Sequence, residues 1–206
     1  MGSSIPKLGL LHYADQQMTC RNLWSDKDAA DAIKTYASKG VSQDLALRTY
    51  TARLLGSDPN LVLHGGGNTS VKTTVKGLFG ELISAICVKG SGWDLSTIEP
   101  EGHPAMRLEP LQALRQLSEL SDEDMVSTQR QNLLNPSAPN PSIEALLHAF
   151  LPHKFVDHTH SIALLAIADQ ENSEKICHEL YGSRVAIVPY VMPGFQLALA
   201  AAKAYE

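Results

Sequence analysis

The sequence predicts a layered α/β fold whose sheet is at least partly antiparallel. Apolar residues recur at helical spacing in both halves of the chain, and two alternating, β-branched segments flank a glycine-bounded turn at 77–80, as in a β-hairpin. Helices mixed with hairpin-linked strands are typical of such folds. The 206 residues contain no repeat or linker, and 44% are hydrophobic, so we expect one domain over 1–206 with an irregular leader over 1–24.

The first half of the chain is predicted to hold two helices, a strand and the hairpin. Ser25 or Asp26 can cap a helix that continues to Ala37, because both side chains accept hydrogen bonds from free helical N–H groups. The other expected elements are a helix over 44–55, a buried strand over 61–64, hairpin strands over 71–76 and 81–89, and an ordered loop over 90–104.

The second half is predicted to be mainly helical. Asn140 and Pro141 are typical of a helix start, as the capping residue and the first helical residue. The segment 161–169 is apolar nearly throughout, so we expect a buried helix there. The remaining expected elements are helices over 109–120, 122–134, 140–151 and 194–206, a strand that ends at 158–160, and a strand over 184–191.

Charge and cysteine content restrict the class of protein. The net charge of −5 and the pI near 5.9 give no electrostatic reason to expect nucleic acid or an anionic membrane as a partner. Cys20, Cys87 and Cys177 are odd in number and widely spaced, which favours free thiols in a reducing compartment. No signal peptide and no long apolar run is evident, so we expect a soluble cytoplasmic protein.

The stretch KFVDHTHS contains a candidate half of a metal site. In a strand, His158 and His160 project to the same face while Thr159 points away. Two neutral imidazoles on one face can bind a zinc ion. The alternative is a chance pair, because the chain has 8 histidines.

Two glycine-rich loops and one helix start form a candidate anion site. HGGGNTS lies between two expected strands, so it is neither a dinucleotide fingerprint nor a P-loop, but its backbone N–H groups and the Asn68 side chain can approach an oxyanion. Ser91 and Gly92 lie in the second loop, and Ser142 lies at the helix start. Glu144 follows in the same turn. The alternatives are an empty glycine turn and a glutamate that only compensates the helix dipole.

Four motifs, GGGNTS, KGSG, PSIE and DHTHS, resemble motifs of the class II aldolase/adducin family and occur in the same order along the chain. The longer stretches VLHGGGNTSVK, VKGSGWDLSTIEP and LLHAFLPHKFVDHTHS are most similar to the aldolase portion of bifunctional rhamnulose-1-phosphate aldolase/dehydrogenase proteins. The resemblance covers about residues 40 to 206. It implies a three-layer α/β/α sandwich around a largely antiparallel mixed sheet, and a cyclic homo-tetramer.

The resemblance also implies a reaction and the residues that perform it. Zn²⁺ or another divalent metal is held by three histidines, two of which are His158 and His160, and Glu144 is the general acid/base. The metal stabilises the enediolate formed when a C3–C4 bond of a ketose phosphate breaks. The residues that cradle the phosphate are Asn68, Ser91, Gly92 and Ser142. The expected protein is therefore an aldehyde-lyase that acts on a short sugar or sugar phosphate resembling rhamnulose 1-phosphate.

Three departures from the family pattern change these expectations. Ile143 replaces a second hydroxyl residue before the glutamate, which removes one phosphate donor. The third histidine is expected beyond Glu206, so we expect a chain truncated at its carboxy terminus with impaired activity. No Rossmann fingerprint for the dehydrogenase half is present. A metal-dependent epimerase or dehydratase, and a non-catalytic adducin-like assembly module, are the alternatives.

Overall fold

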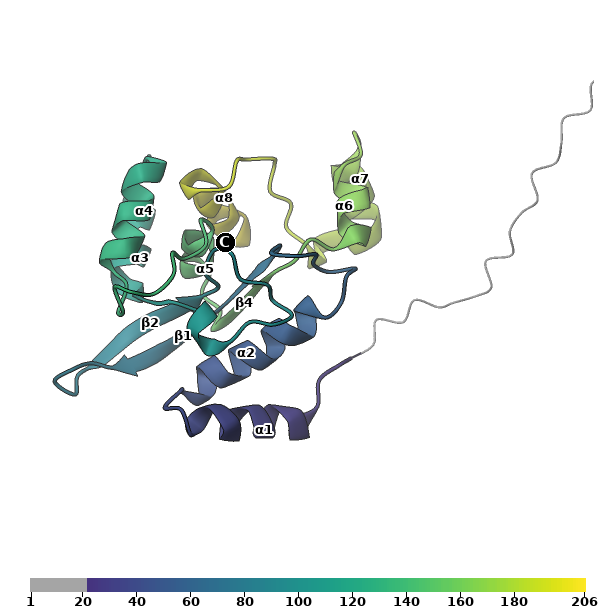
Figure 1. Ribbon diagram of the computed structural model, residues 1–206. Helices are drawn as coiled ribbons and strands as arrows, with labels where there is room; N and C mark the ends of the chain where they lie inside the picture. The colour runs from purple at the N-terminus through teal and green to yellow at the C-terminus, as the bar shows by residue number, and fades with distance from the viewer. Residues whose placement is uncertain (1–21) are drawn as a thin grey trace, which may run out of the picture.

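Residues 22–206, which the computed structural model describes, form helices on both faces of one sheet (Figure 1). The sheet has the strand order β3-β2-β1-β4. Its strands are β1 (Asn68–Lys76), β2 (Leu82–Val88), β3 (Ala105–Arg107) and β4 (Phe155–His158), and all three pairings are antiparallel. The predicted three-layer sandwich is confirmed. The expected leader up to residue 21, and Cys20 within it, lie outside the described residues.

The helices divide between the two faces of the sheet. The first two, α1 (Asp26–Ala37) and α2 (Gln43–Gly56), cover one face, and α2 packs on β1 (Figure 1). The opposite face carries α3 (Leu108–Ala113), α4 (Asp122–Gln131), α5 (Ala145–Phe150) and α8 (Phe195–Tyr205), while α6 (Ile162–Ala168) and α7 (Ser173–Tyr181) pair with each other to one side. Short 3₁₀ turns span Pro100–Gly102, Leu114–Gln116 and Gly182–Arg184. Within residues 22–206, no helix has the length and apolar character needed to cross a membrane.

Serine caps begin three of these helices. The hydroxyl oxygens of Ser25, Ser42 and Ser121 accept hydrogen bonds from the backbone N–H groups three residues ahead. Each bond satisfies one of the N–H groups that a helix start leaves without a partner. The predicted cap at Ser25 is therefore confirmed.

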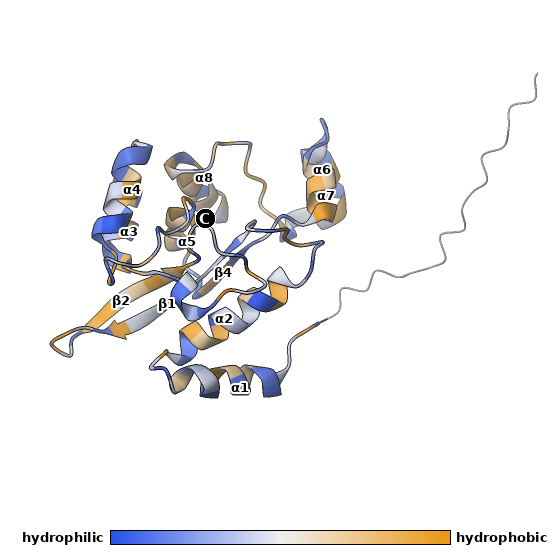
Figure 2. Ribbon diagram, in the orientation of Figure 1, coloured by the Kyte–Doolittle hydropathy of each residue, from blue (hydrophilic) through white to orange (hydrophobic). Residues whose placement is uncertain are grey.

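The main core lies between the sheet and the helices α3, α5 and α8. Ile86, Leu111 and Leu146 are fully buried there, and the rings of Phe150 and Phe195 meet edge to face with centroids 6.4 Å apart. Figure 2 shows that β2 is apolar along most of its length, as expected of a strand covered on both faces. A smaller apolar cluster beneath the glycine loop comprises Ala52, Val62, Leu95 and Ile98.

The hairpin of β1 and β2 is confirmed, and its turn projects away from the helices (Figure 1). The seven paired positions run from Ser70 opposite Val88 to Lys76 opposite Leu82. At the turn, Leu78 and Phe79 are 92% and 91% exposed.

Two predicted strands are wrong. Residues 61–64 form turns instead, because Gly66 N–H donates to Leu63 O and His64 adopts a φ of 51°, which strands do not use. Residues 184–191 are irregular apart from a short 3₁₀ turn, and Pro189 removes a donor that a ladder would need.

The helix predictions for the second half need three corrections. The helix expected over 140–151 begins only at Ala145, because Ser91 N–H donates to Asn140 O and Ser142 N–H donates to Lys89 O, which holds 140–142 against the second glycine loop. The helix expected over 109–120 ends at Ala113. The apolar helix α6 has no buried residue, and its main packing partner is α7.

Candidate metal and anion site

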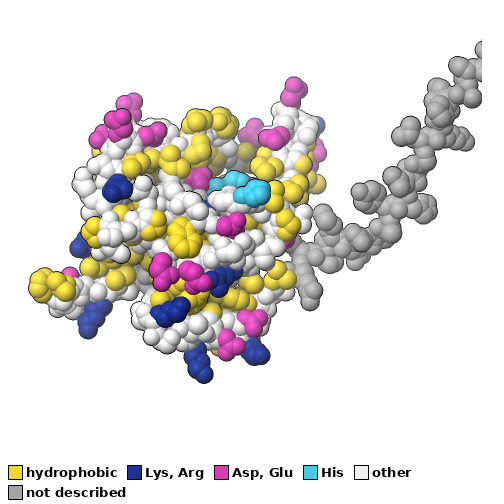
Figure 3. Space-filling view, in the orientation of Figure 1, with side chains coloured by type: hydrophobic (Ala, Val, Ile, Leu, Met, Phe, Trp, Pro, Cys, Tyr) yellow, Lys and Arg dark blue, Asp and Glu magenta, His cyan; other side chains and the backbone are white. Residues whose placement is uncertain are grey.

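A cavity of about 440 Å³ lies where the ends of β1, β2 and β4 meet the start of α5. The two glycine loops form one part of its wall, and the segment 142–144, the two histidines and Pro193 form the rest. All seven residues predicted for the site line this cavity: Asn68, Ser91, Gly92, Ser142, Glu144, His158 and His160. Figure 3 shows histidine side chains at the surface of this face with an acidic side chain beside them.

The two histidines come from the end of β4 and the residues that follow it. Their ring centroids are 4.8 Å apart and the rings are tilted by 57°. The position of His158 is set by the sheet, because it is paired with Asn68 across the β1–β4 ladder. The position of His160 is set by its backbone N–H, which donates to Leu61 O at 2.7 Å.

Glu144 lies at the capping position of α5 and faces His158. Its Oε2 is 3.1 Å from His158 Nδ1 and accepts a hydrogen bond from Asn68 Nδ2 at 2.5 Å. The neighbouring His158 lowers the pKa of Glu144 most, and the Asn68 bond lowers it further, while burial acts in the opposite direction. Glu144 is therefore ionised at neutral pH.

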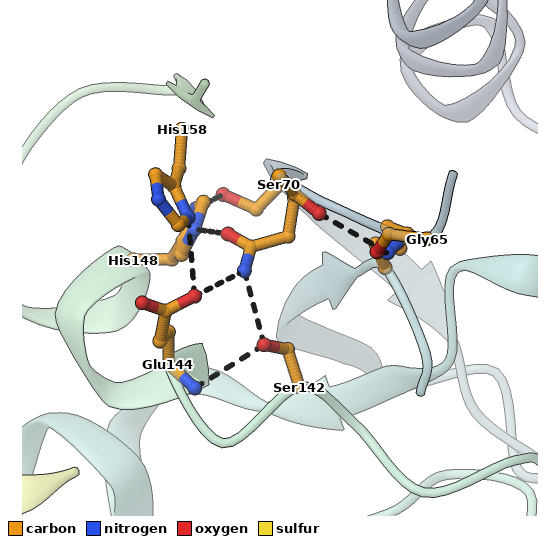
Figure 4. Close-up of polar contacts among 9 residues, drawn as sticks. Gly65, Ser70, Ser142, Glu144, His148 and His158 are labelled. Carbon is orange, nitrogen blue, oxygen red and sulfur yellow. Dashed lines mark hydrogen bonds and ion pairs between the residues drawn. The ribbon is translucent and has the colours of Figure 1, made fainter. Parts of the chain in front are cut away.

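A buried histidine, His148, orients the amide of Asn68. Figure 4 shows His148 between the labelled Ser70 and Glu144. His148 is fully buried, and burial lowers its pKa to about 3, so its ring is neutral. Its Nε2 contacts Asn68 Oδ1 and its Nδ1 lies 2.9 Å from Ser70 Oγ. Since an amide oxygen only accepts, Nε2 carries the proton and Nδ1 accepts from the serine hydroxyl. The amide nitrogen of Asn68 is thereby turned toward Glu144 and Ser142.

A charge pair on the opposite face of the sheet fixes β4 to β1. Arg48, on α2, is 1% exposed, and its Nη1 pairs with Asp157 Oδ1 at 2.6 Å and donates to Ser70 O at 3.3 Å. Asp157 precedes His158, so the Arg48 contact helps to hold the register that places His158 opposite Asn68.

The predicted anion donors are already engaged in several contacts within the site. The backbone N–H groups of Ser91 and Ser142 donate to Asn140 O and Lys89 O, and Ser142 Oγ accepts from both Asn68 Nδ2 and Glu144 N–H. Gly92 has a φ of +83° at the rim, where a side chain would be strained. Ile143 is 43% exposed at the same rim and adds an apolar contact between Ser142 and Glu144.

Lys89 lines the cavity but is not among the site residues predicted from the sequence, where it enters only as the first residue of the KGSG motif. It is 5% exposed, and its Nζ donates to Gly65 O at 2.7 Å and to Gly67 O at 3.1 Å. Burial lowers its pKa, and the charges of Asp94 and Glu144 oppose that shift. The KGSG motif gives its position in the sequence, but its place beneath the first glycine loop follows only from the folded chain.

The donor set fits part of a zinc coordination sphere. Two imidazoles and a carboxylate are the ligand types that zinc prefers, and His158 Nδ1 is buried without a well-aligned hydrogen bond. Within residues 22–206, however, no three His, Cys, Asp or Glu side chains form a group that could hold a metal ion. The described residues therefore supply a pair of imidazoles with Glu144 beside them, short of a complete set of ligands.

Comparisons with known proteins agree with this fold and site. The family model described as the Class II Aldolase and Adducin N-terminal domain matches residues 47–206. The uncharacterized oxidoreductase YuxG of Bacillus subtilis (strain 168) is 39% identical over 178 residues, which make up 86% of this chain but only 24% of that protein. The solved N-terminal class II aldolase domain of a conserved protein from Thermoplasma acidophilum is 42% identical, with a TM-score of 0.74 over 79% of this chain and 76% of that chain.

The family model covers most of the chain, and the solved aldolase domain shares both its fold and a substantial fraction of its residues. The resemblance carried by the glycine loops, PSIE and DHTHS is therefore confirmed, and the chain belongs to the class II aldolase/adducin family.

Proposed function

We propose that this chain is the aldolase-type domain of a metal-dependent lyase that cleaves a short sugar or sugar phosphate resembling rhamnulose 1-phosphate. The observation that carries the proposal is the carboxylate of Glu144, which lies 3.1 Å from His158 in the cavity that His160 also lines. Family membership supports lyase chemistry, and the site supplies a base beside two imidazoles.

Glu144 is suited to move the substrate proton. Its lowered pKa keeps Oε2 ionised at neutral pH, so this oxygen can accept a proton from the substrate and return it later. Asn68 holds the same oxygen in place, and neutral His148 holds Asn68. The contact from His148 through Asn68 to Glu144 therefore fixes where the proton is taken.

His158 and His160 are the residues that would hold Zn²⁺ or another divalent metal, with the remaining ligand or ligands outside the described set. Such an ion, when bound, supplies Lewis-acid polarisation of the substrate's hydroxyl and carbonyl oxygens. A site with two imidazoles should bind metal less tightly than one with three.

Two other readings use the same residues. An epimerase or dehydratase would share the metal and Glu144 and would differ in where the proton returns. An adducin-like assembly module is favoured by one observation, the lack of a three-residue metal group within residues 22–206. Assembly into a homo-oligomer belongs to the same proposal and is supported by the family resemblance. A cytoplasmic location also belongs to it and is supported by the free cysteines Cys87 and Cys177.

Cobalt titration combined with a cleavage assay tests the proposal. Co²⁺ added to the chain should produce visible absorption from imidazole ligands, and His158→Ala and His160→Ala should each weaken binding at least about tenfold. His178→Gln is the matched control, because His178 is exposed on α7 and lies outside the cavity.

Cleavage of rhamnulose 1-phosphate should be slow and should require added metal. Glu144→Gln should retain cobalt binding but lower the cleavage rate by about 10²-fold or more, because it keeps the shape and removes the base. Cobalt absorption that survives in both histidine variants, or equal cleavage by Glu144→Gln and wild type, would contradict the proposal.

A further inference from the structure

Lys89 is a buried positive charge without a negative partner. Within residues 22–206, no carboxylate lies within 4 Å of its Nζ, and its two hydrogen-bond partners are the neutral carbonyls of Gly65 and Gly67. Burying an unpaired ammonium is costly, and charged groups in protein interiors are ordinarily paired. A charge of this kind that lines a cavity indicates a ligand of opposite sign.

The geometry leaves one donor of this ammonium available. A protonated lysine has three N–H groups, and two of them are used by Gly65 O and Gly67 O. The two carbonyl contacts hold Lys89 Nζ beneath the first glycine loop. The backbone of Lys89 lies in the second glycine loop. The remaining N–H has no partner among the described residues, and Lys89 lines the same cavity as Ser91 and Gly92.

We infer that Lys89 holds the anionic head group of the substrate and selects anionic over neutral sugars. The ligand class is an organic oxyanion, either a phosphate monoester or a carboxylate. The inference rests on the proposed function for the identity of the substrate, but not for the binding of the anion.

The Lys89 ammonium also compensates for the hydroxyl donor that is missing at position 143. The apolar side chain of Ile143 offers the anion nothing, and the N–H groups of Ser91 and Ser142 are engaged with backbone carbonyls. A charge-assisted bond from an ammonium is stronger than a neutral one, so one lysine can replace the missing hydroxyl.

Lys72 provides a control with the same local chemistry outside the cavity. It is a half-buried lysine on β1 whose Nζ donates to the carbonyls of His148 and His153, at 2.7 and 2.8 Å. It has no carboxylate within 4 Å among the described residues and does not line the cavity. Lys72→Met therefore removes a similarly bonded ammonium without touching the proposed ligand.

The test is a titration of metal-free protein with inorganic phosphate, acetate and neutral glycerol, followed through backbone amide signals in NMR spectra. We expect phosphate or acetate to shift Ser91 and Gly92 first, and glycerol to shift neither. Lys89→Met should weaken anion binding about tenfold or more, whereas Lys89→Arg, which keeps the charge, should retain most of it. Tighter binding of phosphate identifies a phosphate ester as the substrate class, and tighter binding of acetate identifies a carboxylate.

Lys72→Met should bind the anion as wild type does, and Lys89→Gln, which can still donate to a loop carbonyl, should lose binding as Lys89→Met does. Spectra of the free variants report whether each is folded. The inference is overturned if neither anion binds wild type, if Lys89→Met binds as well as wild type, or if Lys72→Met loses binding to the same extent. Because no metal or turnover is involved, failure here is separate from failure of the cobalt and cleavage tests.

Discussion

Replacing His103 should reduce the sensitivity of the fold to acid. The side chain is 2% exposed, and its Nε2 lies 3.1 Å from Thr69 Oγ1 on the face of β1 away from the site. Burial lowers its pKa to about 3, with the charge of Arg48 acting in the same direction. The folded protein therefore keeps this imidazole neutral at pH values where an unfolded chain protonates it.

The size of the effect follows from that pKa. A histidine in an unfolded chain titrates near 6.5, so His103 costs no stability above that pH. As the pH falls from about 6.5 toward 3, only the unfolded state takes up the proton, and stability is lost at up to about 1.4 kcal/mol per pH unit. Between pH 7.5 and 5.5 the loss attributable to His103 is thus about 1.4 kcal/mol.

Urea unfolding followed by tryptophan fluorescence measures this loss directly. His103→Gln keeps a polar group that can reach Thr69 but does not titrate, so its stability should fall by about 1.4 kcal/mol less than that of wild type over the same pH interval. His178→Gln deletes a histidine that is exposed on α7 and should lose stability in parallel with wild type. Equal acid sensitivity of His103→Gln and wild type would refute the reasoning.

Two further changes test the packing. Gly56→Ala should lower the free energy of unfolding by about 2–3 kcal/mol, as measured by urea unfolding. The reason is that the added Cβ would lie 2.2 Å from Ser96 N and 2.4 Å from the Leu95 carbonyl carbon, both of which are backbone atoms. A variant as stable as wild type would contradict this contact. Cys87 is 2% exposed, and burial raises the pKa of its thiol to about 12. Iodoacetamide at pH 8 should therefore modify Cys177 in the folded protein and should modify Cys87 only after unfolding. Peptide mass spectrometry measures which cysteine is modified.

The parts of the fold that local chemistry determines could be predicted from the sequence. The hairpin follows from alternation around Gly77 and Gly80, and the cap at Ser25 follows from its side chain. The strand expected over 61–64 is wrong because the chain turns there, with Gly66 N–H bonded to Leu63 O and His64 at a positive φ, and an apolar run of four residues does not reveal such a turn. The three-residue strand β3 is too short to carry a periodic signal, and its pairing with β2 is a tertiary event.

Some features of the candidate site could likewise be predicted from the sequence, whereas others depend on the folded chain. The motifs give the residue types and their order, and strand periodicity predicts that the two histidines face the same side. They do lie together, but β4 ends at His158, so the place of His160 depends on the hydrogen bond from its backbone N–H to Leu61 O. The contact between His148 and Asn68 joins residues 80 positions apart in the sequence. The contacts of Lys89 with Gly65 and Gly67 span 24 and 22 positions. None of these contacts has a local pattern, because a buried imidazole and a buried ammonium are recognised only by what surrounds them.

The hairpin turn offers a place to modify the protein at a distance from its cavity. Strand β1 runs from Asn68 at the cavity to Lys76 at the turn, and eight steps at roughly 3.3 Å each separate the two ends by about 26 Å. Leu78 and Phe79 lie almost wholly in solvent, and seven paired positions behind them join the two strands. An affinity tag, a fluorophore or a small inserted domain placed between Gly77 and Gly80 should therefore report on the molecule, or immobilise it, with the ligand-binding end left free.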